Sequence, residues 1–505
     1  MLERYVKRIL EARVYDVAVE SPLDEAPQLS ARLDNRVLIK REDLQPIHSF
    51  KLRGAYNKIV RLDPKQRRLG VIAASAGNHA QGVALAAARL DIKAHIVMGR
   101  NTPPIKVNAV RALGGHVILH GDTYDDAARH ALELIEKHGY IQIPPYDDID
   151  TIAGQGTVGM ELLRQQPGAL DAIFVPVGGG GLIAGIAAYV KYLRPEVQVI
   201  GVEPDGSHCL AAAKAAGRRV TLPYDKLDLF ADGVSVAQIG KEPFRIARKY
   251  VDDVMIVNTD AICAAVKDIY EDTRSLAEPA GALSVAGMKA WVERQGGAGR
   301  TLIAIHSGAN LNFDRMRHIS ERADLGEKRE AILAVTIPER PGSFRRFCRV
   351  IGKRSVTEFN YRYADPTRAH VFVGLALSPA RDRETFVERL SEEGYPVVDM
   401  TDNEMAKLHV RHLVGGRAPG DHSELIFRFE FPERPGALMN FLTVLGERWN
   451  ISLFHYRNHG AAWGRVLVGF HASKADRAAL VKSLGATGYR FWEETDNPAY
   501  AQFLA

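Results

Sequence analysis

Apolar and polar positions alternate in blocks along the first 320 residues. Short apolar runs that predict buried strands, each followed by a stretch with helical spacing, lie at 70–74, 93–98 and 116–120. A second series of the same kind includes the runs 172–177, 198–203 and 301–305. Repeated strand–helix alternation predicts mostly parallel, doubly wound sheets. We expect two such lobes, with a ligand site between them at the carboxyl ends of the strands.

The pattern changes at residues 321–330, a charged stretch that predicts the boundary between a helix and a linker. An internal repeat follows, because the segment Pro-Glu-Arg-Pro-Gly occurs at 338–342 and again at 432–436. Each copy lies between a predicted strand and an amphipathic helix, and two more strands follow. The order β-α-β-β-α-β predicts two ferredoxin-like α+β domains. A glycine-rich linker is expected at 412–422.

These patterns predict three domains, whose boundaries we place at 1–320, 330–402 and 424–495. The composition is that of a soluble globular protein, with 46% hydrophobic and 25% charged residues. The net charge of +5 comes from interspersed basic and acidic residues, so no nucleic-acid partner is expected. The three cysteines lie far apart, which argues against a metal site and favours a reducing cytoplasm. We expect neither a signal peptide nor a membrane span.

Four consecutive glycines, Gly178, Gly179, Gly180 and Gly181, separate the run 172–177 from the apolar helical stretch that begins at Leu182. A bare backbone loop at a helix start offers several N–H groups to an anion. No Lys-Ser or Lys-Thr pair follows the glycines, so the loop is not an NTP-binding P-loop. The spacing also departs from the dinucleotide fingerprint. The loop therefore predicts a phosphate site for a ligand other than ATP or NAD.

Lys51 stands in the segment His-Ser-Phe-Lys-Leu-Arg-Gly-Ala, ahead of the first lobe. A lysine taken alone is most often a solvated surface residue. The functional alternative is a lysine that forms a Schiff base with an aldehyde cofactor. Such a cofactor needs a second group by which the protein binds it, and the glycine loop would bind its phosphate.

Two polar turns follow predicted strands. The first is Ser75-Ala76-Gly77-Asn78-His79, and the second is His306-Ser307-Gly308-Ala309-Asn310. Either turn alone is as readily explained by a helix cap as by a ligand contact. The first turn also suits a carboxylate cradle, built from backbone N–H groups and the Ser75 hydroxyl. When Lys51, the glycine loop and the two turns occur in one chain, they indicate a ligand site much more specifically than any of them does alone.

The segments Ser-Phe-Lys-Leu-Arg-Gly-Ala-Tyr at 49–56 and Ser-Ala-Gly-Asn-His-Ala-Gln-Gly at 75–82, with the glycine loop, resemble the fold-type II pyridoxal-phosphate enzymes. More narrowly, the chain resembles the biosynthetic threonine dehydratases, whose paired regulatory ACT-like domains match the repeat. The resemblance covers nearly the whole chain. It implies a two-lobed α/β catalytic domain followed by two ferredoxin-like regulatory domains, with pyridoxal 5′-phosphate as cofactor.

The resemblance also assigns roles. Lys51 would carry the cofactor and act as the catalytic base. Substrate carboxylate contacts would come from the segment holding Ser75, Gly77 and His79. Further cofactor contacts would come from Phe50 beside the ring, Asn78 on the ring oxygen, Ser307 on the pyridine nitrogen, and Gly178, Gly179, Gly180, Gly181 and Leu182 on the phosphate. The segment that begins at Glu278 matches the family as well, without an assigned role.

The reaction implied is the dehydration and deamination of L-threonine to 2-oxobutanoate and ammonia, with L-serine as a further substrate. Isoleucine would inhibit, valine would oppose it, and the enzyme would be a homotetramer. Candidate effector contacts are Tyr361, Arg362, Tyr456 and Arg457, although these aromatics are as readily explained by packing. Related serine racemases carry a serine where this chain has Ala76, so dehydration ranks above racemisation.

Three alternatives to this assignment remain. The same fold supports a β-replacement enzyme or a serine-preferring ammonia-lyase. A non-catalytic amino-acid sensor is a further alternative, which the intact Lys51 disfavours. The repeat itself could be a dimerising scaffold without a ligand.

Overall fold

A computed structural model describes residues 1–327, 329–338, 346–347, 350–351, 356–362, 367–377, 382–410, 424–432, 440–441, 444–445, 449–457, 463–473 and 475–503. The chain forms two compact units, Met1–Phe313 and Asp314–Ala505. Among the helices in these ranges, none is both long and apolar enough to cross a bilayer.

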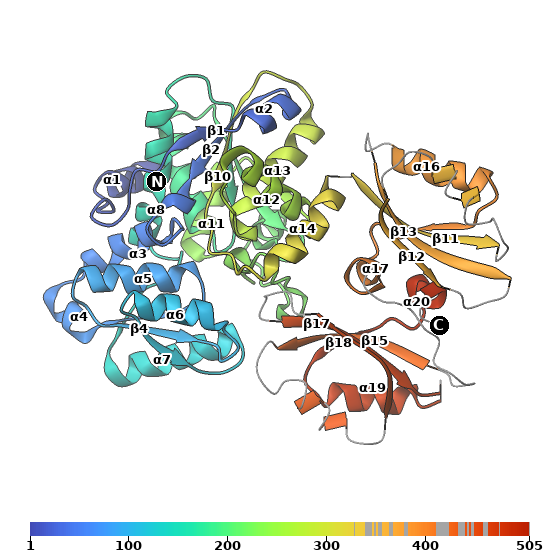
Figure 1. Cartoon of the computed structure of the whole chain (residues 1–505). Coiled ribbons are helices and arrows are strands. Elements are labelled where there is room, and N and C mark those ends of the chain that lie inside the picture. The colour runs from blue at the N-terminus through green and yellow to red at the C-terminus, as the bar shows by residue number, and fades with distance from the viewer. Residues whose placement is uncertain are drawn as a thin grey trace. The chain divides into compact units, whose positions relative to one another are not determined.

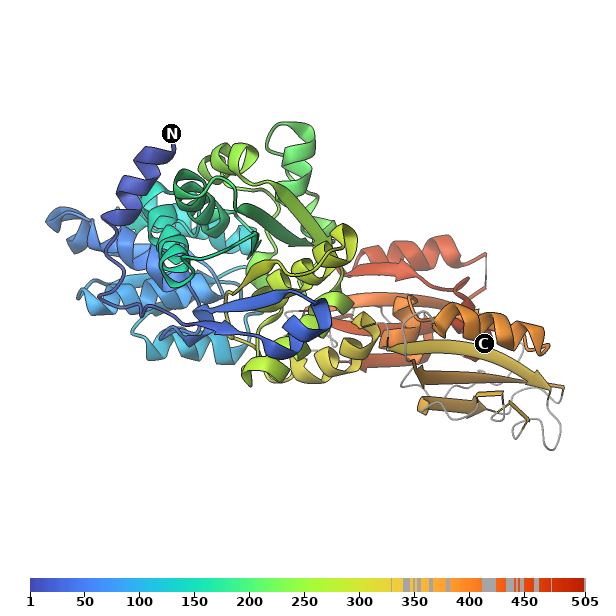
Figure 2. The same ribbon diagram turned by 90° about the horizontal axis from the view of Figure 1, so that it is seen from above.

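The larger lobe of the first unit is built on a six-stranded sheet in the order β1-β2-β10-β7-β8-β9. Only β1 runs antiparallel to its neighbour, and the other pairs are parallel. The strands are β1 (Leu23–Glu25), β2 (Arg36–Arg41), β7 (Ala172–Pro176), β8 (Gln198–Pro204), β9 (Asp253–Val257) and β10 (Thr301–His306). The N-terminal strands, deep blue in Figure 2, thus belong to the lobe formed mainly by the second strand–helix series.

The helices of this lobe cover both faces of its sheet (Figure 1). Its helices are α1 (Leu2–Leu10), α2 (Pro27–Leu33), α8 (Ile149–Gln165), α9 (Gly181–Leu193), α10 (Cys209–Ala216), α11 (Lys241–Tyr250), α12 (Thr259–Thr273) and α13 (Pro279–Gln295), with 3-10 turns η1 (Glu42–Leu44), η2 (Tyr224–Lys226) and η3 (Asp232–Val234). One continuous apolar core joins the sheet to α8, α9 and α11. Val175, Ile183 and Ile303 lie in this core without exposure.

The smaller lobe has a parallel sheet in the order β5-β4-β3-β6. Its elements are α4 (Pro64–Leu69), β3 (Val71–Ala74), α5 (Asn78–Arg89), β4 (Ala94–Met98), α6 (Pro104–Ala112), β5 (His116–Leu119), α7 (Tyr124–His138) and β6 (Ile141–Gln142). One face of the sheet packs against α5 and the other against α7. The doubly wound arrangement expected from the sequence is confirmed in both lobes.

Helix α3 (Lys51–Val60) joins the two lobes. Ala55 and Ile59 pack in the core of the smaller lobe. Close packing brings α5 onto the start of α3, because a Cβ on Gly82 would lie 3.2 Å from the Lys51 backbone. Arg53 is fully buried on another side of α3. The position of Lys51 is therefore set by contacts on several sides of its helix.

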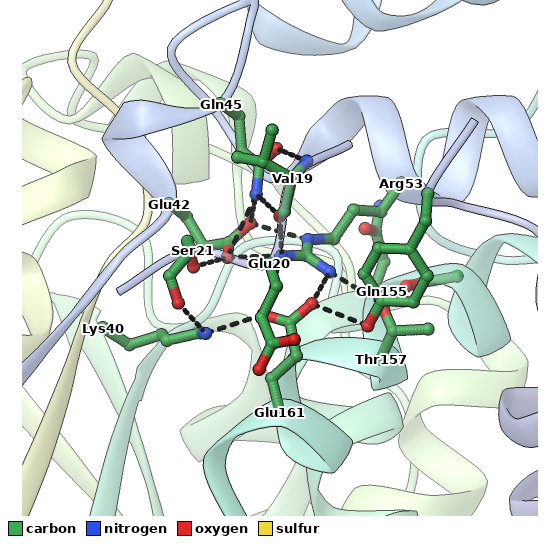
Figure 3. Close-up of polar contacts among 12 residues, drawn as sticks. Val19, Glu20, Ser21, Lys40, Glu42, Gln45, Arg53, Gln155, Thr157 and Glu161 are labelled. Atoms are coloured by element: carbon green, nitrogen blue, oxygen red, sulfur yellow. Dashed lines mark hydrogen bonds and ion pairs between the residues drawn. The ribbon is translucent and has the colours of Figure 1, made fainter. Parts of the chain in front are cut away.

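Arg53 is the centre of a buried charge network (Figure 3). Its guanidinium reaches Glu42 at 2.8 Å and Glu161 at 2.6 Å, and Lys40 reaches Glu161 at 2.6 Å. All four side chains are fully shielded from solvent. Two positive and two negative charges balance, as buried ions require. Burial raises the pKa of Glu161, but the two cations more than offset this, so its pKa is lowered overall.

Further hydrogen bonds satisfy the network. The Ser21 hydroxyl donates to Glu42 at 2.5 Å, and the Thr157 hydroxyl accepts from Arg53 at 3.0 Å. Lys40 and Arg53 also donate to the backbone carbonyls of Ser21 and Val19. The network thereby ties the N-terminal segment to β2, α3 and α8. It holds α3 in place two residues from Lys51.

The second unit contains two antiparallel sheets, β12-β13-β11-β14 and β16-β17-β15-β18. Both orders are those of the ferredoxin-like fold, as the repeat predicts. The elements are α14 (Arg315–Gly326), β11 (Glu330–Pro338), β12 (Val356–Arg362), β13 (Arg368–Ala376), α16 (Asp382–Glu392), β14 (Val397–Asp399), α17 (Glu404–Leu408), β15 (Glu424–Pro432), β16 (Asn450–Arg457), β17 (Trp463–His471), α19 (Arg477–Gly485), β18 (Arg490–Glu493) and α20 (Pro498–Phe503).

The two sheets share an apolar cluster with α17 and α20. It includes Phe372 from the first sheet, Ile426 from the second, and Met405 and Tyr500 from the two helices. Helix α14 occupies most of the charged stretch expected at the boundary. The Glu-Arg-Pro-Gly part of each repeat copy and the predicted linker 412–422 lie outside the described residues.

Candidate active site

A pocket with about 440 Å³ of empty space, part of it open to solvent, lies in the first unit. Its lining comes from segments that are distant in the sequence. All the predicted cofactor-binding residues line it, namely Phe50, Lys51, Asn78, Gly178, Gly179, Gly180, Gly181, Leu182 and Ser307. The remaining lining residues are Tyr146, Pro176, Gly233, Val234, Glu278 and Ala280.

Lys51 is half-buried at the start of α3, rather than a solvated surface residue. Its Nζ donates to the carbonyl of Pro145 at 3.4 Å and lies 5.3 Å from the centre of the Phe50 ring. Burial lowers the pKa of the Lys51 ammonium to about 8, against a smaller opposing effect of Glu278. The neutral amine is the nucleophilic and basic form. Lys51 is therefore available in that form close to physiological pH.

The glycine loop fits tightly between its neighbours. A Cβ on Gly179 would overlap the Tyr146 ring, and one on Gly178 would lie 2.9 Å from the backbone of Val234. Gly180 has a φ of 90°, which favours glycine. Helix α9 begins at Gly181, so its free N–H groups face the loop. A phosphate is the kind of group that such a bare helix start stabilises.

The turn after β3 holds the predicted carboxylate contacts. The Ser75 hydroxyl accepts from the backbone N–H of Gly77 at 3.3 Å. A Cβ on Gly77 would meet no atom within 4 Å, so the backbone is open there. Asn78 is among the pocket-lining residues, and the other predicted contacts of this turn, Ser75, Gly77 and His79, are not.

His79 is buried and neutral. Its Nε2 lies 2.8 Å from the carbonyl of Ile143, which can only accept, so Nε2 carries the proton. Nδ1 has no hydrogen-bond partner among the described residues. Burial, reinforced by the charge of Lys51, lowers the pKa of His79 to about 3. His79 therefore offers an acceptor at Nδ1 across the working pH range.

This lowered pKa has a measurable effect on stability. Below pH 6.5 the unfolded chain binds a proton at position 79 that the native chain does not, so stability falls as the pH falls toward 3. The free energy of unfolding of the unaltered protein should fall between pH 7 and pH 5. In His79→Gln we expect this fall to be smaller by about 2 kcal/mol. Urea unfolding of both proteins at the two pH values measures this. An identical pH dependence in the variant would contradict the buried, neutral state of His79.

Ser307 connects two sides of the pocket. It follows β10, and its side chain is buried. Its hydroxyl donates to the carbonyl of Ala280 at 3.3 Å, and its own carbonyl accepts from the N–H of Phe50 at 3.4 Å. The hydroxyl is thus a neutral polar group held at the pocket wall.

Sequence reasoning missed the roles of several residues at the pocket. Tyr146 packs on the glycine loop, and Glu278 accepts from the Asn78 amide at 2.6 Å. Asn310 in turn donates to Asn78 at 2.7 Å. The sequence did indicate Glu278, because this residue begins a segment that matches the family. Nothing in the sequence indicated Tyr146, since its contacts depend on how its loop meets the glycines.

A glutamate taken from the sequence alone is most often a solvated carboxylate, and for Glu203 that interpretation is wrong. Glu203 is fully buried, and its two oxygens accept from the N–H groups of Leu210 at 2.8 Å and Ala211 at 2.9 Å. It therefore caps the start of α10. Burial raises the pKa of Glu203 to about 7. Within the described ranges, no three or more His, Cys, Asp or Glu side chains are grouped to hold a metal ion.

The candidate effector contacts lie on corresponding strands of the two sheets of the second unit. Tyr361 and Arg362 end β12, where they pair with Val371 and His370 of β13. Tyr456 and Arg457 end β16 in the same way, beside Val466 and Arg465 of β17. The side chains of these four residues lie outside the described part of the chain.

Comparisons with known proteins agree with this arrangement. Residues 15–308 match the family of pyridoxal-phosphate-dependent enzymes. The pocket residues and the paired parallel sheets thus define a pyridoxal-phosphate-dependent enzyme. Residues 321–410 and 415–504 each match the C-terminal regulatory domain of threonine dehydratase.

Comparison with individual proteins identifies the family within the pyridoxal-phosphate-dependent enzymes. A biosynthetic L-threonine dehydratase of Burkholderia multivorans is 54% identical over 504 residues, covering 99% of each chain. The processed form of threonine deaminase isoform 2 from Solanum lycopersicum superposes with a TM-score of 0.62 and 48% identity, over 64% of this chain and 93% of that one. Maize serine racemase gives a TM-score of 0.59 and 36% identity, over 62% and 95%. The chain belongs to the threonine dehydratase family.

Proposed function

We propose that this chain is a threonine ammonia-lyase that converts L-threonine to 2-oxobutanoate and ammonia, the first committed step of isoleucine biosynthesis. One observation carries the proposal. Lys51, the glycine loop and Ser307 line one pocket, in a chain that matches biosynthetic threonine dehydratases over 99% of its length. L-Serine is the expected second substrate.

The pocket suits pyridoxal 5′-phosphate. Lys51 would hold the aldehyde carbon, and the start of α9 offers bare backbone to the phosphate. Phe50 would pack beside the ring. The other contacts would come from Asn78 on the ring oxygen, Ser307 on the pyridine nitrogen, and Gly178, Gly179, Gly180, Gly181 and Leu182 around the phosphate.

When bound, the cofactor acts as an electron sink that acidifies the α-proton of the amino acid. Lys51 is the group placed to remove that proton, because its pKa of about 8 leaves a larger share of the amine neutral than an ordinary lysine has. Ser307 presents a hydroxyl rather than a carboxylate, which favours loss of the β-hydroxyl over transamination. Ala76 has no proton to donate, so racemisation lacks a second acid there.

The substrate carboxylate would bind at the turn of Ser75, Gly77 and His79. Open backbone at Gly77 leaves room for a ligand. A neutral His79 adds no charge of its own, so the attraction would come from backbone N–H groups and the Ser75 hydroxyl.

Keto-acid production tests this proposal. The holoenzyme should form 2-oxobutanoate from threonine and pyruvate from serine, with the larger kcat/KM for threonine. A larger value for serine would favour a serine-preferring ammonia-lyase. Product formation only when an external nucleophile is added would indicate a β-replacement enzyme, and no product from either amino acid would indicate a sensor.

We propose further that the second unit senses amino acids, with isoleucine as inhibitor and valine opposing it. The paired regulatory domains support this, and an effector must bind two states of the enzyme unequally to regulate it. Tyr361, Arg362, Tyr456 and Arg457 stay the candidate contacts. We also propose a homotetramer of the cytoplasm, where the buried thiols of Cys209 and Cys263 would stay reduced.

Removal of the residues after about 325 separates catalysis from regulation. The pocket lining lies between residues 50 and 307, so turnover of threonine should be retained. Inhibition by isoleucine should be abolished. Initial rates with and without isoleucine, measured on the full chain and the truncated one, test this. Unchanged inhibition of the truncated enzyme would contradict the proposed sensor.

A further inference from the structure

The side chains of Asn310, Asn78 and Glu278 form a hydrogen-bonded row, and the last two of them line the pocket. The Asn310 amide nitrogen donates to the carbonyl of Ile47 at 2.7 Å and to Oδ1 of Asn78 at 2.7 Å. The Asn78 amide nitrogen donates to Oε1 of Glu278 at 2.6 Å. The three residues come from the loop after β10, the start of α5 and the residue before α13.

One backbone carbonyl fixes which group donates and which accepts in each of these hydrogen bonds. The carbonyl of Ile47 only accepts, so Asn310 must turn its NH₂ group toward it. The same NH₂ group meets Asn78, which must therefore present its oxygen. Asn78 then presents its NH₂ group to Glu278, and a carboxylate accepts it. One of the two N–H groups of Asn78 is thereby used, and the other is left for the pocket.

Close packing holds the side chains of Asn78 and Glu278 in this arrangement. A Cβ on Gly308 would lie 2.7 Å from Oε1 of Glu278 and 3.2 Å from the amide nitrogen of Asn78. The backbone N–H of Glu278 also donates to the carbonyl of Gly308 at 3.1 Å. Little room is left for either side chain to turn.

A helix cap does not explain Glu278. It is the N-cap residue of α13, yet in the described part of the chain its side chain makes no capping hydrogen bond. Its side chain lines the pocket instead and is 5% exposed. The negative charge of Glu278 acts on Lys51, where it favours the ammonium form. The other titratable group coupled to Lys51 in the described residues is His79, which stays neutral.

We propose that Glu278 and Asn310 are positioning residues for the cofactor, which hold the amide of Asn78 in one orientation and place a negative charge opposite Lys51. Glu278 holds the Asn78 amide and also supplies the negative charge, whereas Asn310 only holds the amide. The two residues therefore differ in one predicted property, the pH at which Lys51 captures the cofactor. Because capture precedes turnover, its outcome does not depend on which amino acid the enzyme deaminates.

The test follows cofactor capture by the full-length apoenzyme, using visible absorbance at a series of pH values. Asn310→Ala should weaken pyridoxal 5′-phosphate binding by about tenfold, through a loosened Asn78, with the pH midpoint of capture unchanged. Glu278→Ala should weaken binding by about tenfold or more and move the midpoint to lower pH. Without the carboxylate, Lys51 becomes neutral at a lower pH.

Glu278→Gln separates geometry from charge. Its amide oxygen can still accept from Asn78, so affinity should stay within about threefold. The midpoint should nevertheless move to lower pH, because the charge is gone. Asn258→Ala is a matched control, since Asn258 caps α12 and is not part of the pocket. Its affinity and midpoint should equal those of the unaltered protein.

Far-UV circular dichroism and thermal unfolding of each apoenzyme establish that the variants are folded. Native affinity in both Asn310→Ala and Glu278→Ala would overturn the proposal. An unshifted pH midpoint in Glu278→Gln would overturn it as well.

Discussion

Lys51→Ala is expected to abolish turnover, by at least about a thousandfold, while leaving the protein folded. The substitution removes the nitrogen that would carry the cofactor and the base that would move the α-proton. Among the described residues, the Lys51 ammonium makes one long hydrogen bond, to the carbonyl of Pro145, so its loss should cost little stability. Keto-acid formation from threonine and far-UV circular dichroism together measure the two effects.

Two further variants sharpen this prediction. Lys51→Arg keeps a positive charge but stays protonated at every working pH, so it should be as inactive as the alanine variant. Lys65→Ala removes an exposed lysine near the start of α4 and should leave turnover unchanged. Activity of Lys51→Arg within about tenfold of the unaltered enzyme would contradict the assigned role of the neutral amine.

Arg53→Met is expected to lower the unfolding free energy of the catalytic unit by about 3–5 kcal/mol. The variant keeps an apolar side chain in place but leaves Glu42 and Glu161 buried with too little positive charge (Figure 3). Urea unfolding of the apoenzyme at neutral pH measures the loss. Because α3 begins at Lys51, cofactor binding should weaken in the same variant.

Arg36→Met is the matched control for this network. Arg36 pairs with Glu25 at 2.6 Å, but both side chains are at least half exposed. Exposed pairs contribute about 0–1 kcal/mol, so the control should be nearly neutral. Equal losses in the two variants would mean that the burial of the Arg53 network has no special effect.

Much of this architecture can be predicted from local sequence. The apolar run 172–177, the four glycines and the following helix specify a strand, a bare loop and a helix start, as observed at β7 and α9. Lys51 and Ser307 could be assigned because each stands in a motif that matches the family. The repeat likewise predicted two ferredoxin-like sheets, which the strand order confirms.

What could not be predicted depends on contacts between distant segments. Strand β2 pairs with β10 from the far end of the catalytic unit, and no local pattern at residues 36–41 indicates that partner. Glu203 lies near the end of β8, where the sequence alone favours a solvated carboxylate, yet α10 packs so that its first N–H groups meet the side chain. Glu278 and Asn310 meet at Asn78 only because three chain segments converge there.

The most direct test is borohydride reduction of the holoenzyme followed by peptide mapping. Reduction should fix the pyridoxyl group on a single peptide, attached to the ε-nitrogen of Lys51. A label on another lysine, or no label on a colourless and well-folded protein, would contradict the central claim that Lys51 binds the cofactor in this pocket.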